Sequence, residues 1–100
     1  MAAATLRRYS ASLTTTTPTT LATVPAGRAL VISKIAVAAS GASTVTLTIG
    51  GAAVATGFAL TAGQVYTETG LVALAGETVT ATAGTANQLV VSVFGEEVDN

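Results

Sequence analysis

Much of the chain alternates between apolar and polar residues with a period of two. In residues 44–49, Thr-Val-Thr-Leu-Thr-Ile, three aliphatic side chains fall on one face and three threonine hydroxyl groups on the other. Successive side chains of a β-strand point to opposite faces, so this pattern predicts a strand with one buried and one solvated face. Residues 78–83, Thr-Val-Thr-Ala-Thr-Ala, repeat the pattern with smaller apolar side chains. An apolar period of about 3.6 residues, which would predict a packed helix, is not sustained anywhere in the sequence.

Turn signals divide the chain into short segments. An Ala-Gly pair followed by a polar or charged residue precedes a strand-like segment three times, at residues 26–28, 62–64 and 75–77. Glycine adopts positive φ without steric cost, so each triplet predicts a tight turn. The expected strands are residues 20–24, 29–38, 44–49, 52–55, 58–60, 65–69, 71–74, 77–83 and 89–94. About eight short strands joined by brief turns predict an all-β fold, a single antiparallel β-sandwich or jelly roll.

The expected organisation has three parts. Residues 1–18 predict an extended N-terminal arm, because the threonine run before Pro18 offers no helical face and favours extended backbone. Residues 19–95 form the β-sandwich domain, and residues 96–100 form an acidic C-terminal tail. A chain of 100 residues has room for one core.

Two expected strands are apolar on both faces. Under strict alternation, Leu30 and Ile32 point one way, while Val31, Ile35 and Val37 point the other way. In residues 89–94 the side chains of Val90 and Phe94 likewise oppose three aliphatic side chains, those of Leu89, Val91 and Val93. The second apolar face is covered either by a loop or the arm of the same chain, or by another subunit.

Composition favours assembly over catalysis. Half of the residues are hydrophobic, but 21 of these are alanine, and 9% of the chain is charged, against about 25% in an ordinary globular domain. A thin core with apolar strand faces and few surface charges favours a homo-oligomer. Histidine and cysteine are absent, which excludes disulfide frameworks, the usual zinc ligands and His-dependent triads. We therefore expect no enzyme activity, no catalytic residue, no cofactor and no metal.

The charges are segregated along the chain. All four basic residues lie in residues 1–34 and all five acidic residues in residues 35–100. Four scattered cations do not make the basic face that binds nucleic acid, so we expect no nucleic-acid partner. The segregation suggests a head-to-tail contact in which the arm of one subunit reaches the acidic end of the next. The residues expected at this interface are Arg7, Arg8, Tyr9, Leu13, Val90, Phe94, Glu96 and Glu97.

Membrane insertion and secretion are not expected. Residues 35–67 carry no charge, but glycine, threonine and serine interrupt them too often for a spanning helix. Residues 9–20 are too polar to be the apolar core of a cleavable leader.

Candidate chemistry is sparse. Glu68 and Glu77 could serve as an acid and base pair of the glycosidase type, although solvated charges are the commoner role of such residues. The chain has four aromatic residues, scattered along the sequence, and packing is their default role: Tyr9, Phe58, Tyr66 and Phe94. A carbohydrate platform around Tyr66 is the alternative.

The turn and strand signals together resemble a known group of proteins. Residues 21–28 (LATVPAGR), an apolar strand, and residues 44–51 (TVTLTIGG) are followed by residues 60–64 (LTAGQ) and residues 71–79 (LVALAGETV). This series resembles small Ala- and Thr-rich β-sandwich proteins of tailed-bacteriophage virions, and the likeness spans residues 19–95.

The resemblance implies a non-enzymatic virion protein made in the cytoplasm of a bacterial host. Its leading form is a capsid decoration, or minor head, protein that binds the phage major capsid protein in many copies, with a trimer as one arrangement. A neck, tail or fibre component that contacts the host surface is the alternative, and a carbohydrate-binding module is a third option.

Overall fold

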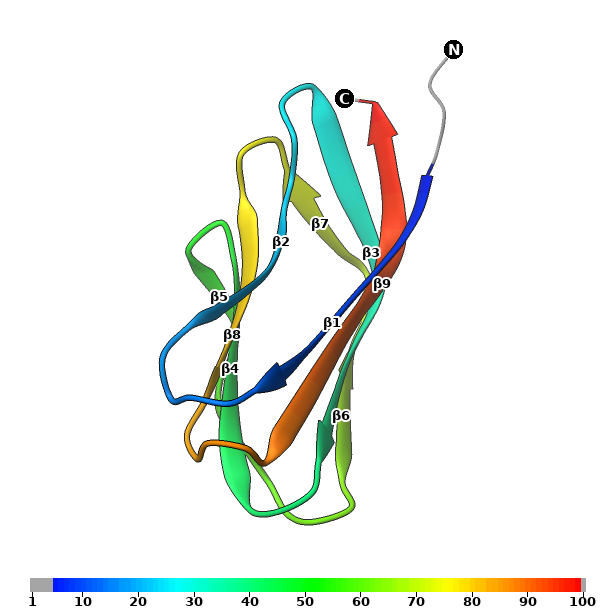
Figure 1. Ribbon diagram of the computed structural model, residues 1–100. Coiled ribbons are helices and arrows are strands. Elements are labelled where there is room, and N and C mark those ends of the chain that lie inside the picture. Colours follow the sequence, from blue (N-terminus) through cyan, green and yellow to red (C-terminus); the bar gives the residue numbers. More distant parts are fainter. Residues whose placement is uncertain (1–4, 100) are drawn as a thin grey trace.

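The structure is a computed structural model that describes residues 5–99. These residues form nine strands in two antiparallel sheets and contain no helix. The sheets lie face to face, as Figure 1 shows with both seen from the side. The all-β, two-sheet architecture predicted from the alternation is confirmed.

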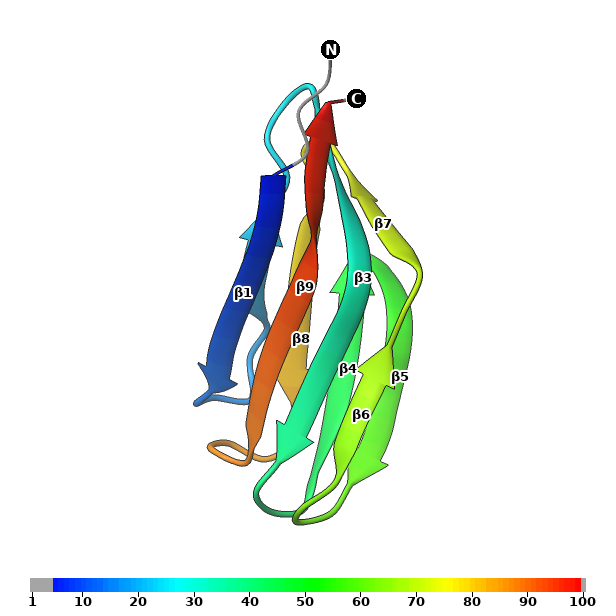
Figure 2. The same cartoon turned by 90° about the vertical axis from the view of Figure 1, so that its right-hand side faces the viewer.

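Each sheet has a simple strand order. Sheet A has the order β1 (Thr5–Leu13), β9 (Leu89–Asp99), β3 (Arg28–Ala39) and β6 (Val65–Glu68), and β7 (Leu71–Leu74) pairs with the other half of β3. Sheet B has the order β2 (Thr19–Thr23), β8 (Thr78–Ala83), β4 (Ser43–Ile49) and β5 (Ala52–Leu60). Figure 2 looks onto the outer side of sheet A, with β1, β9 and β3 side by side.

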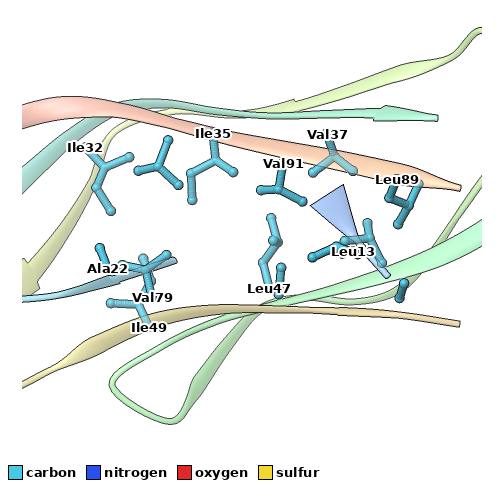
Figure 3. Close-up of a cluster of buried hydrophobic side chains, with 14 of the residues drawn as sticks. Leu13, Ala22, Ile32, Ile35, Val37, Leu47, Ile49, Val79, Leu89 and Val91 are labelled. Atoms are coloured by element: carbon cyan, nitrogen blue, oxygen red, sulfur yellow. The ribbon is translucent and has the colours of Figure 1, made fainter. Parts of the chain in front are cut away.

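The core fills the space between the two sheets (Figure 3). In β4 and β8 alternate residues are buried, as the period of two predicts. Val45 and Leu47 point inward from β4, and Ala81 and Ala83 point inward from β8. Sheet A supplies most of the larger core side chains, which offsets the alanines of β8.

The expected N-terminal arm is not confirmed. Residues 5–13 form β1, which pairs with β9 along its whole length in sheet A. Leu13 is only 1% exposed, and Tyr9 packs against the core. The sequence contains the reason, because Tyr9, Ala11 and Leu13 alternate with polar residues and give this segment an apolar inner face. Residues 1–4 lie outside the described residues.

Two other expected boundaries shift. The acidic tail is not separate, because residues 96–99 continue β9, while residue 100 lies outside the described residues. The predicted strands 52–55 and 58–60 are one strand, β5. Gly57, with a φ of 59°, allows this strand to continue through an irregular step. At that step its N–H group donates a hydrogen bond to Thr46 Oγ1 over 3.0 Å.

The expectation that β3 is apolar on both faces is wrong for most of its residues. The pairing of β3 with β9 shifts between Ile32 and Lys34, so Ser33 is an extra residue, a β-bulge. The extra residue shifts the in–out alternation of side chains by one position. Ile32 and Ile35 therefore both point into the core, with no exposed surface. Leu30 and Val37 are also buried. Val31 is the one apolar residue of this set that points outward and is exposed.

Gly95 is the partner of this bulge on β9. A Cβ atom at Gly95 would lie 2.4 Å from the carbonyl oxygen of Val31, which is far inside van der Waals contact with backbone. Ser33 Oγ donates a hydrogen bond to the carbonyl oxygen of Phe94 over 3.1 Å. The other edge of β3 is also divided at the bulge, because β7 pairs with residues 29–32 of β3 and β6 pairs with residues 35–38.

The bulge predicts the effect of replacing Gly95→Ala. The added methyl group must push the β3 backbone away, so the free energy of unfolding should fall by about 1–3 kcal/mol. Chemical denaturation monitored by circular dichroism measures this change. Ser92→Ala, at an outward position of the same strand, is the control and should alter stability by less than about 0.5 kcal/mol. Equal stability of both variants would contradict the close backbone approach.

The pairing of β1 with β9 can be tested with cysteines, because the chain has none. Ser10 and Ser92 are direct partners with their hydroxyl oxygens 3.3 Å apart. The double variant Ser10→Cys, Ser92→Cys should form an intrachain disulfide and run as a monomer on a non-reducing gel. The double variant Ser12→Cys, Ser92→Cys, offset by two residues, should not, because diagonal positions are too far apart. Covalent multimers of the first variant would show that β1 pairs with another copy.

Candidate interaction surface

The outer face of sheet A is the most apolar surface of the described residues. Seven large hydrophobic residues among residues 5–99 are exposed, and six of them point outward from this sheet. The six are between 43% and 79% exposed: Leu6, Val31, Val65, Val72, Leu74 and Val90. Several large apolar side chains exposed on one face often mark a contact with another molecule.

Strand register sets the arrangement of this face (Figure 2). Leu6 on β1, Glu96 on β9, Val31 on β3 and Val72 on β7 form one row across the sheet. The next row consists of Arg8 on β1, Phe94 on β9 and Lys34 on β3. Directly opposed residues on neighbouring strands lie on the same face, so apolar and charged side chains stand beside one another.

A shallow groove of about 520 Å³ runs between these two rows. Its lining residues are Leu6, Arg7, Arg8, Val31, Ser33, Phe94, Gly95 and Glu96. Two of them, Ser33 and Gly95, are the residues of the bulge, so the bend in the sheet contributes to this depression. The groove is the concave part of an otherwise open face.

Phe94 has a basic residue as its neighbour on each adjacent strand. The Lys34 Nζ atom is 5.3 Å from the centroid of the Phe94 ring, within the range of a cation–π interaction. Arg8 is the direct partner of Phe94 on the other neighbouring strand. Arg8 takes part in none of the ion pairs formed among residues 5–99.

Half of the predicted interface residues lie on this outer face. Arg8, Val90, Phe94 and Glu96 point outward from β1 and β9. The other four predicted residues, Arg7, Tyr9, Leu13 and Glu97, point to the inner side of sheet A. Leu13 in particular is a core residue and offers no surface to a partner.

The charges at the two ends of the chain meet within the chain. The Glu97 side chain is 10% exposed. Its Oε2 atom lies 3.5 Å from Arg7 Nε, and its Oε1 atom lies 3.3 Å from Arg28 Nε. Arg28 also pairs with Asp99. The head-to-tail interpretation assigned these complementary charges to neighbouring subunits. Antiparallel pairing of β1 with β9 and of β3 with β9 instead satisfies Arg7, Arg28 and Glu97 internally.

An aromatic pair that sequence analysis missed lies at the other edge of the sandwich. The ring centroids of Phe58 on β5 and Tyr66 on β6 are 4.5 Å apart, with an angle of 41° between the rings. The Tyr66 hydroxyl group donates a 2.5 Å hydrogen bond to Glu68 Oε2. This bond, burial and the negative charge of Glu68 all raise the pKa of Tyr66 above its usual 10.0. The pair joins an edge strand of each sheet, which only the tertiary structure reveals.

The two candidate glycosidase carboxylates have different partners. Glu68 accepts a hydrogen bond from the Tyr66 hydroxyl group. Glu77 Oε1 accepts a 2.7 Å hydrogen bond from the backbone N–H group of Leu74, across the turn before β8. Within residues 5–99 no cluster of three or more acidic residues could hold a metal ion. The same residues contain no helix that could span a membrane.

Comparison with known proteins adds no relative. No family model matches the chain, and the search of curated proteins finds no match.

The contrast between Glu97 and Glu96 gives a matched test of the internal ion pairs. Glu97→Gln removes a nearly buried charge that two arginines share, so the free energy of unfolding should fall by about 1–2 kcal/mol. Glu96→Gln removes an exposed charge that forms no ion pair within residues 5–99 and should cost less than about 0.5 kcal/mol. Urea denaturation of both variants measures the difference. A larger loss for Glu96→Gln would contradict the arrangement.

Proposed function

We propose that this chain is a non-enzymatic structural protein of a tailed-bacteriophage virion, a decoration protein that binds the assembled capsid shell in many copies. One observation carries the proposal, the exposed apolar outer face of sheet A. The resemblance of residues 19–95 to virion β-sandwich proteins supports a virion as the assembly that this face contacts. The partners proposed are further copies of the chain and the major capsid protein, in a virion assembled in the cytoplasm of a bacterial host.

The physical basis is that the free chain leaves apolar surface in water. Burial of apolar surface stabilises a contact by about 25 cal/mol per Å². Six large outward hydrophobic side chains therefore favour a contact that covers them. A repeated lattice strengthens such contacts through avidity, without requiring each one to be strong. The charges on the same face would orient the contact more than they strengthen it.

The opposite side of the molecule has different chemistry. The four strands of sheet B contain no charged residue, and the outward positions of β4 and β8 are threonines that are at least partly exposed. Thr48 and Thr80 form a hydrogen bond across these strands. A hydroxyl-covered face tolerates water, whereas the apolar face favours a partner. A protein with one face against a shell and the other in solvent has this asymmetry.

The proposal is tested by counting copies in purified virions that contain the chain. Quantitative mass spectrometry should find hundreds of copies per particle, as a protein of the shell requires. A handful of copies, or one small ring, would place the chain in the neck or tail and overturn the decoration role. Binding of the isolated chain to a glycan array, without binding to particles, would favour the carbohydrate-binding alternative.

The contact face is tested by reconstitution on particles that lack the chain. Val72→Asp and Leu74→Asp add a charge to exposed positions of the outer face of sheet A that lie outside the groove, and they should reduce particle binding by about tenfold or more. Thr82→Asp adds the same charge to the outward side of sheet B and should leave binding unchanged. Equal binding of all three variants would show that sheet A is not the contact face.

A further inference from the structure

We infer that the partner which covers the groove of sheet A is a second copy of this chain, in a two-fold dimer that pairs Arg8 of each copy with Glu96 of the other. The inference rests on the proposed function only for the statement that this face is covered in the assembled state. Its basis is the placement of four side chains on two adjacent strands.

The four side chains occupy the corners of a rectangle. Arg8 is the direct partner of Phe94, and Leu6 is the direct partner of Glu96, across the antiparallel pair of β1 and β9. All four line the groove. The two charged residues therefore lie on one diagonal of the rectangle, and the two apolar residues lie on the other.

This arrangement is complementary to itself. A two-fold axis in the plane of the sheet, along the diagonal from Leu6 to Phe94, brings Arg8 of each copy close to Glu96 of the other. Each positive corner then faces a negative corner of the second copy, and this happens twice in the dimer. Leu6 and Phe94 fall on the axis and pack against their own counterparts. Closed two-fold interfaces of this kind are the commonest in homo-oligomers.

The charges on this face favour a second copy of the chain over a partner that is purely acidic or purely basic. Neither Arg8 nor Glu96 takes part in an ion pair among residues 5–99, although Arg7 and Glu97, the adjacent residues, pair with each other. An acidic partner would leave Glu96 opposed by like charge, and a basic partner would do the same to Arg8. A surface with the same two charges in exchanged positions satisfies both, while Lys34, the third charge on this face, lies over the Phe94 ring of its own chain.

The two-fold axis centres the contact on the groove. The diagonal runs obliquely to the strands, so the strands of the two copies cross and the sheets overlap over only part of the 45 × 21 Å face. The contact is therefore smaller than the about 800 Å² that each partner contributes to a standard interface, which predicts a weak dimer. The exposed hydrophobic residues away from the groove lie outside this contact and stay available to the shell: Val65, Val72, Leu74 and Val90.

Charge exchange tests the dimer in solution. Sedimentation equilibrium of the wild-type chain should show a monomer–dimer equilibrium. Arg8→Glu and Glu96→Arg, each measured alone, should raise the dimer dissociation constant by at least about tenfold, because each variant places two like-charged pairs in the interface. An equimolar mixture of the two variants should dimerise again, because every contact in the mixed dimer joins opposite charges. Recovery in the mixture also shows that both variants are folded.

Controls separate this result from other causes. Thr82→Glu changes the charge on the opposite side of the sandwich and should leave the dimer intact. Leu6→Asp, at the most exposed apolar position of the groove, should weaken the dimer without involving either charged residue. A wild-type chain that remains monomeric at about millimolar concentration, or a mixture that remains as weak as the single variants, would overturn the inference.

The outcome is distinguishable from that of the proposed function. If the charge-exchange mixture dimerises but virions contain only a handful of copies, the dimer stands and the decoration role fails. If virions contain hundreds of copies but the charge exchange has no effect on self-association, the role stands and the dimer fails.

Discussion

The close approach of two backbones at Gly95 is the constraint on which the rest of sheet A depends. The extra residue Ser33 lies opposite this point, and a side chain on Gly95 would collide with the Val31 carbonyl oxygen. The bulge allows Ile32 and Ile35, which are an odd number of residues apart, to point into the same core. Without it, one half of β3 would present its aliphatic residues to water, and the thin core would lose its largest contributors.

The same bend affects the outside of the sheet. It coincides with the gap between β6 and β7 on one side of β3 and contributes two lining residues to the groove on the outer face. Phe94, whose carbonyl oxygen accepts the Ser33 hydroxyl group, lies beside that groove with Lys34 over its ring. Core packing and the candidate contact surface therefore have a common structural origin in this fold.

Charge segregation along the chain has a structural role within one molecule. The basic N-terminal part and the acidic C-terminal part come together because β9 lies between β1 and β3, so Glu97 is within reach of Arg7 and Arg28. Such pairs help define register more than they add stability, since desolvation offsets much of their attraction. Arg8 and Glu96 point to the outer face of sheet A and take part in none of these pairs. Neighbouring charged residues on β1 and β9 therefore divide into an inner, paired set and an outer set.

The sequence by itself determined the fold class, most turns and the buried faces of β4 and β8, because a period of two and glycine at turns are local properties of the chain. It also contained the six outward hydrophobic residues, but not which of them share a face. Tertiary structure decided that residues 5–13 are a strand, because an edge strand needs a neighbour, and β9 is more than 75 residues away in sequence. Tertiary structure also decided the phase of β3 and the partners of Glu97 and Tyr66, because a bulge and a cross-sheet contact depend on residues that meet only after the sheets have paired.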